Sequence, residues 1–350
     1  MAPRFQSLRV IEARADPAGS LVVAFDTPAS WRDFTPGQFL TLRATVAGHD
    51  IRRCYSICSG LDDGPLRVAI KQLPGGLFSS WAAETLATGQ TLAVAPPDGR
   101  FGIAPQPNAA RVFAAFAAGS GITPILSIMK TSLAREPASR FFLFFGNRTT
   151  HDIMFRDEIE DLKDRHMRRL SVFHVLSRER QELDILNGRL DAGKIPALLR
   201  LMPEPDHVFI CGPETMISGA RDALAAAGVA ADRLHEERFT ASPDGARGLA
   251  PVASDAVPAA IAILVLDGAR IEVPLRPGET IIDGALRMGR DPPFSCKAGM
   301  CCTCRARLIE GRVEMAANYS LEPWETEAGY VLACQARPLT ARVVVDFDQV

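Results

Sequence analysis

The spacing of four cysteines constrains the fold of this chain more than any other feature. Cys296, Cys301 and Cys304 follow the pattern C-x4-C-x2-C, and Cys334 lies much further along the chain. Because thiolates are soft ligands, four of them on one loop and one distant strand can hold a 2Fe-2S cluster. The C-terminal part must therefore fold so that this loop and that strand meet. A structural zinc site is the alternative, although such sites more often show two C-x2-C pairs.

The residues between these cysteines suit a cluster-binding loop. Ala298 and Gly299 are small, so the loop can wrap around inorganic sulfur and direct its N–H groups toward it. Cys302 falls inside the x2 gap. We expect Cys301 and not Cys302 to be the ligand, because only Cys301 keeps the x4 spacing from Cys296.

Composition excludes several classes of protein. The 350 residues are 47% hydrophobic and 23% charged, which is typical of a globular protein with two or three domains. The 39 Lys and Arg nearly balance the 41 Asp and Glu, so we expect no nucleic-acid partner. The longest apolar runs, 112–118 and 261–266, are far shorter than the roughly 18 residues that span a bilayer, and no apolar targeting segment opens the chain. We therefore expect a cytoplasmic protein with no membrane partner, and in that compartment its eight cysteines should be reduced thiols.

A segment rich in proline, glycine, alanine and serine divides the chain. Residues 241–258 show no apolar periodicity and are predicted to be a linker. Before it, short strands separated by turns predict an antiparallel β-barrel over residues 1–105, and buried runs alternating with amphipathic segments predict a doubly wound α/β domain over 106–240. After it, a hairpin signal at Asp267–Gly268 opens a small α+β domain over 259–350.

Two segments of the predicted barrel suit a flavin. Arg53-Cys54-Tyr55-Ser56 ends a strand, and Gly75-Gly76-Leu77-Phe78-Ser79 opens a helix. A flavin dinucleotide needs an aromatic plane, a cation for its phosphates and N–H groups at a helix N-terminus. These segments supply all three, although Tyr55 is equally compatible with an ordinary strand aromatic and Arg53 with a surface charge.

A glycine-rich turn marks the second predicted domain. Gly119-Ser120-Gly121-Ile122-Thr123-Pro124 follows a buried strand and opens a helix. Glycines let the backbone approach a pyrophosphate, and the helix N-terminus adds partial positive charge. A glycine-rich turn alone is weak support for a dinucleotide-binding site.

Taken in order, four segments of the barrel resemble the flavin domain of the ferredoxin-NADP reductase superfamily. They are Pro36-Gly37-Gln38, Arg53 to Ser56, Gly75 to Ser79 and Pro96 to Phe101. The resemblance implies that Arg53 meets the FAD pyrophosphate, Tyr55 the isoalloxazine and ribityl, and Ser56 the flavin N5, while Gly75, Gly76 and Ser79 form the turn at the helix N-terminus. Strict strand alternation puts Tyr55 and Ser56 on opposite faces, so the role of Ser56 requires a local bend.

The glycine-rich turn resembles the nicotinamide-binding loop of the same superfamily. Its candidate residues are Gly119, Ser120, Gly121 and Thr123. The resemblance also places Cys211, Gly212 and Pro213, at the end of a later strand, beside the nicotinamide ring. Ser56 and Cys211 are therefore the candidate catalytic residues, although Cys211 is also compatible with a small buried thiol.

Two candidate strand tips bear on the choice of dinucleotide. NAD sites often hold the ribose with an acid at a strand tip, whereas arginine favours a 2′-phosphate. The tips read Asn147-Arg148 and Ser177-Arg178, with Glu179 following. Ser177-Arg178 resembles the NADP-type pair of the superfamily, so NADPH is the expected donor and NADH the alternative.

Residues from about 259 to 350 resemble a plant-type ferredoxin, whose fold is a β-grasp. The complete order of domains, first flavin, then nicotinamide and last ferredoxin, resembles that of the reductase components of multicomponent oxygenases. Segments 52–58, 176–180 and 318–338 carry a closer resemblance to those of phenylacetyl-CoA epoxidases, bacterial di-iron monooxygenase systems of phenylacetate catabolism. This implies an NAD(P)H-dependent oxidoreductase that passes electrons through FAD and a 2Fe-2S cluster to an oxygenase component. The alternatives are the reductase of a ketosteroid or aromatic-ring hydroxylase, and a non-catalytic redox sensor that retains its cofactors.

Acidic residues gather near the cluster loop in sequence. They are Glu310, Glu314, Glu322, Glu325 and Glu327, with Arg312 as the only base between them. Such a run is either a solvated face or a surface that steers an oxygenase partner.

Overall fold

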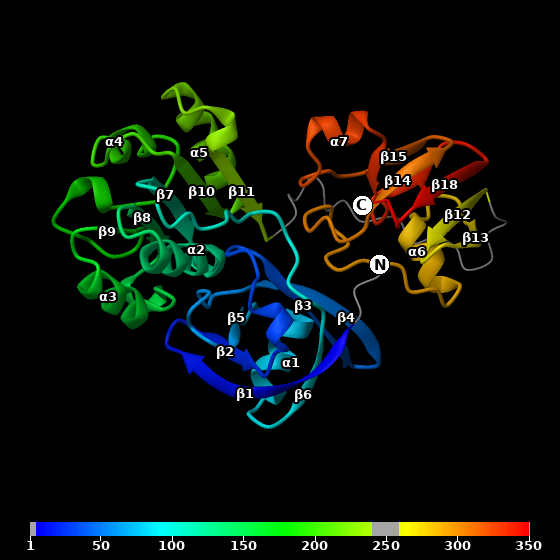
Figure 1. Cartoon of the computed structure of the whole chain (residues 1–350), viewed down its shortest axis with the longest axis horizontal. Helices are drawn as coiled ribbons and strands as arrows, with labels where there is room; N and C mark the ends of the chain where they lie inside the picture. Colours follow the sequence, from blue (N-terminus) through cyan, green and yellow to red (C-terminus); the bar gives the residue numbers. More distant parts are fainter. Residues whose placement is uncertain (1–4, 240–258, 350) are drawn as a thin grey trace. The chain divides into compact units, whose positions relative to one another are not determined.

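The computed structural model describes residues 5–239 and 259–349 (Figure 1). These residues fall into two compact units, a larger one of residues 6–51 and 55–239 and a smaller one that consists mainly of residues 259–349. The predicted linker, 241–258, lies outside the described residues. No helix of the described ranges is long and apolar enough to cross a membrane.

The N-terminal part of the larger unit is an antiparallel barrel. Its sheet has six strands in the order β4-β3-β6-β1-β2-β5. A further bridge pairs Ile57, directly after β4, with Val68 of β5, so the two outer strands also meet and the sheet closes. The elements are β1 (Gln6–Asp16), β2 (Ser20–Phe25), η1 (Ala29–Trp31), β3 (Phe39–Val46), β4 (His49–Ser56), β5 (Leu66–Lys71), α1 (Leu77–Thr85) and β6 (Thr91–Val94).

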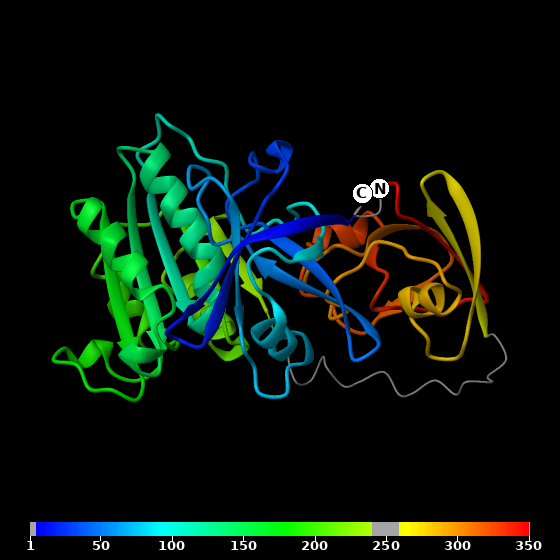
Figure 2. The same ribbon diagram turned by 90° about the horizontal axis from the view of Figure 1, so that it is seen from below.

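The second part of the larger unit is a parallel sheet of five strands in the order β11-β10-β7-β8-β9. Figure 2 shows strands of this sheet, in green, with helices beside them. Its strands are β7 (Val112–Ala118), β8 (Arg140–Asn147), β9 (Leu170–Leu176), β10 (His207–Gly212) and β11 (Leu234–Arg238). Its helices are η2 (Gly119–Gly121), α2 (Ile122–Arg135), η3 (Thr150–Asp152), α3 (Arg156–Arg165), η4 (Asp184–Leu186), α4 (Ile195–Leu199), α5 (Glu214–Ala226) and η5 (Ala231–Arg233).

This parallel sheet is buried on both faces. Along β7, Phe113 packs in one apolar cluster with side chains of α2 and α3, whereas Phe116 packs in another with side chains of α4 and α5. The strand order reverses between β7 and β10, and ligands of such sheets bind outside the carboxyl ends of the strands at this switch point.

The smaller unit is a mixed sheet in the order β13-β12-β18-β14-β16, with a separate pair of β15 and β17. Its elements are β12 (Ala260–Leu266), β13 (Ala269–Leu275), α6 (Ile281–Arg287), β14 (Arg305–Glu310), β15 (Val313–Met315), α7 (Pro323–Glu327), β16 (Tyr330–Leu332), β17 (Ala336–Pro338) and β18 (Arg342–Asp346). Asp267 and Gly268 both have positive φ, 49° and 75°, as a tight hairpin between β12 and β13 requires.

The predicted fold class, a barrel, a doubly wound domain and a small α+β domain, is confirmed. One local prediction is wrong, because Cys334 lies between two short strands and not on a strand. The N–H of Gln335 donates to the carbonyl oxygen of Leu332 at 2.8 Å, and this turn separates β16 from β17. The fourth cysteine is therefore presented by a tight turn.

Candidate functional site

The four predicted cluster cysteines lie as two neighbouring pairs in the smaller unit. The N–H of Cys296 points at Sγ of Cys301 at 3.5 Å, and Cys304 and Cys334 are both almost fully buried. The adjacent Cys334 thiol, together with burial, raises the pKa of the Cys304 thiol. Among the described residues, no group of three or more acidic, histidine or cysteine side chains converges on a single ion. Two pairs of soft donors fit a 2Fe-2S cluster, in which each iron takes two protein ligands.

The backbone of the cysteine loop also fits such a group. The N–H of Ala298 lies 3.3 Å from Sγ of Cys296, and the side-chain amide of Gln335 donates to Sγ of Cys334 at 3.6 Å. Gly299 has φ of 76°, and a Cβ there would lie 2.9 Å from the carbonyl oxygen of Ala317, so only glycine suits this position.

Cys302 is oriented differently from its neighbour Cys301. Its thiol donates to the carbonyl oxygen of Ser320 at 3.2 Å, and its φ of 55° lies in the left-handed region that non-glycine residues rarely adopt. The backbone conformation directs this thiol toward the segment before α7.

Tyr55 and the glycine turn of the barrel both adjoin α1. The ring of Tyr55 packs against Phe78 of α1 with 5.7 Å between ring centroids. Gly75 has a positive φ of 71°, and Gly76 precedes the helix without a side chain that could cap its first N–H groups. The hydroxyl of Ser79 accepts from the N–H of Leu73 at 3.2 Å and so holds this turn closed. The uncapped first turn of α1 suits a phosphate group.

Ser56 is the last residue of β4, and Ile57 directly after it still pairs with neighbouring strands of the barrel. The N–H of Ile57 donates to the carbonyl oxygen of Gln38 at 2.8 Å, and Ile57 then pairs with β5. Ser56 is buried, while Arg53 on the same strand is exposed and donates to the carbonyl oxygen of Arg52 at 2.8 Å. The role of Ser56 at the flavin N5, and the local bend that this role requires, stay predictions.

An acid that sequence reasoning missed lies beside Ser56. The hydroxyl of Ser56 donates to Oε2 of Glu237 at 3.2 Å, and Glu237 on β11 is paired in register with Cys211 on β10. Burial raises the pKa of Glu237 to about 8, against the opposing effect of the Ser56 hydrogen bond. Burial likewise raises the pKa of the Cys211 thiol. A strongly perturbed carboxyl in such a place is typical of a functional site.

The switch point brings into contact the two segments that are predicted to bind the dinucleotide. A Cβ at Gly121 would overlap the carbonyl oxygen of Cys211, so the glycine turn rests directly on the Cys211-Gly212-Pro213 corner. The hydroxyl of Thr123 donates to the carbonyl oxygen of Ser120 at 3.0 Å and holds the turn, and Gly119 has a positive φ of 54°.

Lys71, at the end of β5, was also missed. Its Nζ lies 3.8 Å from where a Cβ of Gly119 would be, so an ammonium group faces the turn. Burial and the nearby Arg148 lower the pKa of Lys71, while Asp152 and Asp16 oppose the shift. The sequence gives no signal that the last residue of this half-buried strand lies beside the glycine turn.

The two predicted strand tips are bonded to each other. The N–H of Arg178 donates to the carbonyl oxygen of Arg148 at 2.8 Å, and both arginines are exposed. The carboxylate of Glu179 accepts from the N–H and the hydroxyl of Thr150, each at 2.7 Å, and these hydrogen bonds lower its pKa. Glu179, the acid that could hold the ribose hydroxyls of NADH, is therefore already hydrogen-bonded to Thr150.

The acidic run near the cluster loop does not form one exposed surface. Glu325 is fully buried and forms an ion pair with Arg305, so its inclusion among the steering acids is wrong. Its other oxygen accepts from the N–H of Glu322 and caps α7. Glu322 and Glu327 are exposed, and Trp324 between them is 60% exposed.

Comparison with known proteins gives three family matches along the chain. Residues 16–103 match the oxidoreductase FAD-binding domain, 116–222 the oxidoreductase NAD-binding domain and 264–339 the 2Fe-2S iron-sulfur cluster binding domain.

Two curated relatives match over nearly their whole length. A component of 1,2-phenylacetyl-CoA epoxidase from Escherichia coli K12 is 42% identical, covering 98% of each chain. The ferredoxin reductase component of 3-ketosteroid-9-alpha-monooxygenase from Rhodococcus rhodochrous is 35% identical, covering 97% of this chain and 95% of the relative. The solved structure of phthalate dioxygenase reductase shares the fold, with a TM-score of 0.59 at 21% identity and 98% of each chain covered.

Proposed function

Because the chain belongs to the family of FAD- and NAD-binding oxidoreductases that carry a 2Fe-2S domain, we propose that it is the reductase component of a phenylacetyl-CoA epoxidase. It takes electrons from NADPH and delivers them to the oxygenase component, a di-iron monooxygenase. The observation that carries the electron-transfer route is the contact of the Gly121 turn with Cys211, next to the Ser56–Glu237 hydrogen bond. The identity of the oxygenase is supported by the 42% identity over nearly the whole chain.

FAD, when bound, converts a two-electron hydride into the single electrons that a 2Fe-2S cluster carries. The residues proposed to hold it are Arg53, Tyr55, Ser56, Gly75, Gly76 and Ser79. Because the pKa of Glu237 is about 8, its carboxyl holds a proton at neutral pH. The hydrogen-bonded pair of Ser56 and Glu237 can therefore move a proton to or from a group bound beside the serine hydroxyl.

The dinucleotide is proposed to lie across the switch point. Its pyrophosphate would meet the turn from Gly119 to Gly121 and the ammonium group of Lys71, and its nicotinamide would lie beside Cys211. Arg178 and Arg148, on adjoining strand tips, suit a 2′-phosphate, and Glu179 is bound to Thr150. This arrangement favours NADPH over NADH.

The cluster is proposed to be held by Cys296 and Cys301 on one iron and by Cys304 and Cys334 on the other. We further propose that residues 1–105, 106–240 and 259–350 form the flavin, dinucleotide and ferredoxin domains, and that 241–258 link the last two. This division is supported by the three family matches, each of which lies inside one of these ranges.

A second candidate is the reductase of a 3-ketosteroid hydroxylase, because that relative is 35% identical. The test supplies the purified protein, loaded with FAD and cluster, to the oxygenase components of both systems with NADPH. Epoxidation of phenylacetyl-CoA at a rate well above ketosteroid hydroxylation supports the proposal. Turnover of the ketosteroid alone would favour the second candidate, and turnover of neither would contradict both.

A further inference from the structure

Helix α2 touches both halves of the proposed hydride-transfer site. Its N-terminus follows the glycine turn from Gly119 to Gly121. Its side rests on residues 59–63, the loop that begins three residues after Ser56. One helix therefore connects the dinucleotide turn with the segment that carries the serine at the end of β4.

Two buried hydroxyls of α2 hold this loop by its backbone. The hydroxyl of Ser127 donates to the carbonyl oxygen of Ser59 at 2.7 Å, and both side chains are fully buried. The hydroxyl of Thr131, 2% exposed, accepts from the N–H of Leu61 at 3.2 Å. Hydrogen bonds to the backbone hold the loop independently of its side chains. Buried hydrogen bonds of this kind are costly to break, because the partner group is then left unsatisfied.

The close approach of helix and loop depends on Gly60. A Cβ at Gly60 would lie 3.0 Å from Cβ of Lys130, so a larger residue would push the loop away from α2. The contact is thus built from a small residue on the loop and two hydroxyls on the helix.

A partly buried charge cluster lies beside this contact. We define the joint cluster as Asp63, Arg67, Lys130 and Glu158. Lys130, 8% exposed, binds Asp63 at 2.5 Å and Glu158, and Arg67 binds the same oxygen of Glu158 at 2.7 Å. Burial opposes ionisation of Asp63 and Glu158, but hydrogen bonding to Lys130 and its charge lower both pKa values. Barrel, α2 and α3 are therefore tied together by ions that pair at neutral pH.

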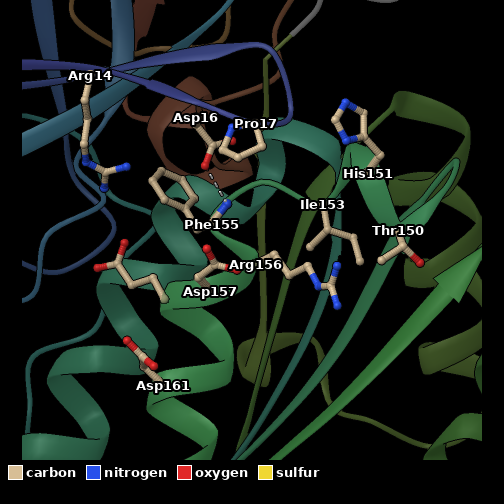
Figure 3. A pocket seen from close by; sticks show the side chains of 11 residues that line it. Arg14, Asp16, Pro17, Thr150, His151, Ile153, Phe155, Arg156, Asp157 and Asp161 are labelled. Carbon is tan, nitrogen blue, oxygen red and sulfur yellow. Dashed lines mark hydrogen bonds between the residues drawn. The ribbon is translucent and has the colours of Figure 1, made fainter.

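A second contact lies beside the joint cluster. A cavity of about 430 Å³ lies between the β1–β2 turn and α3. Figure 3 shows side chains that line it, and there Oδ1 of Asp16 accepts from the N–H of Phe155 at 3.2 Å. Phe155 has φ of 56°, so the start of α3 adopts an unfavourable backbone conformation at this contact. The barrel thus contacts the start of α3 here as well as at the joint cluster.

We propose that Ser127 and Thr131 are positioning residues for hydride transfer, which set the place of the dinucleotide turn relative to Ser56. The inference rests on the proposed function, which puts the flavin beside Ser56 and the dinucleotide at the turn. In the step concerned, a hydride with both its electrons leaves C4 of the dihydronicotinamide, which becomes aromatic, and bonds to N5 of the flavin. A displacement of about 1 Å between the reacting groups can slow such a reaction roughly 100-fold. The two hydrogen bonds between α2 and residues 59–63 therefore affect the rate, although neither hydroxyl contacts a cofactor.

The test compares four variants of α2 in the full-length protein loaded with FAD and cluster. Ser127→Ala and Thr131→Val each remove one bond to the loop. Ser132→Ala is the matched control, because that buried hydroxyl donates to the carbonyl oxygen of Ile128 within the helix itself. Anaerobic stopped-flow mixing with NADPH measures the limiting rate of flavin reduction separately from the Kd of the nucleotide.

We expect Ser127→Ala and Thr131→Val each to lower the limiting rate about ten-fold, with Kd changed less than about two-fold and the control near the wild-type rate. Thr131→Ser keeps the acceptor oxygen and should restore the rate. The long-wavelength absorbance of nicotinamide stacked on flavin should weaken in the two slow variants, which a general loss of stability would not cause.

Equal limiting rates for the two variants and the control would overturn the inference. So would a Thr131→Ser variant as slow as Thr131→Val. If Ser127→Ala loses its FAD, the comparison of Thr131→Val with Thr131→Ser decides whether the inference holds. Failure of the proposed function looks different, because the wild-type flavin itself would then not be reduced by NADPH.

Discussion

Replacing Glu237 by glutamine should remove a pH dependence of stability that this one carboxyl creates. Its pKa rises from the ordinary 4.5 to about 8, chiefly through burial. An acid with a raised folded-state pKa stays protonated while the unfolded chain ionises. Its contribution to stability is therefore complete below pH 4.5 and is lost as the pH rises toward 8. For a shift of this size, the free energy of unfolding should fall by about 2 kcal/mol between pH 6 and pH 8. Glu237 keeps part of its surface exposed, so this figure is an upper bound.

The measurement is thermal unfolding of the FAD-loaded wild type and Glu237→Gln at several pH values. Since about 1 kcal/mol shifts Tm by roughly 2–4 °C in a unit of this size, the Tm difference between the two proteins should change by roughly 4–8 °C from pH 6 to pH 8, in favour of glutamine at high pH. The other titrating groups are common to both proteins and cancel in the difference. Parallel Tm curves would refute the assignment of a raised pKa to Glu237.

Two further predictions concern the smaller unit, and a third concerns the glycine turn from Gly119 to Gly121. Cys302→Ala should keep the visible absorbance of the cluster and Cys301→Ala should lose most of it; the reverse pattern would contradict the ligand assignment. Replacing Glu322 and Glu327 by glutamine should slow association with the oxygenase most at low salt, since exposed charges are screened as ionic strength rises, and an unchanged salt dependence would indicate a merely solvated face. Gly121→Ala should abolish flavin reduction by NADPH, because its Cβ would overlap the carbonyl oxygen of Cys211, and a wild-type Kd and rate would contradict the proposed place of the nucleotide.

Periodicity and turn chemistry predict most of the fold. The alternation of buried runs and helices predicts the parallel sheet, and the switch point then brings the Gly119 turn and the Cys211 corner together without further information. The hairpin at Asp267–Gly268 follows from two residues that tolerate positive φ. These features depend on local sequence and on general rules of sheet topology.

The features that sequence reasoning missed depend on which surfaces become covered. Glu237 and Lys71 look like ordinary polar positions of strands, and only the packing of barrel against sheet puts them beside Ser56 and Gly119. Glu325 looks like a surface acid until its pairing with Arg305 is seen. The apolar run around Cys334 looks like one strand, although a turn at Gln335 interrupts it.

The most direct test of the electron route is an anaerobic titration of the full-length protein, loaded with FAD and cluster, with NADPH. The absorbance bands of the flavin and of the 2Fe-2S cluster are followed together. The proposed route predicts that both bands bleach as NADPH is added, and that both recover when an artificial one-electron acceptor is supplied. Bleaching of the flavin alone, with cluster absorbance unchanged or absent, would contradict transfer from flavin to cluster.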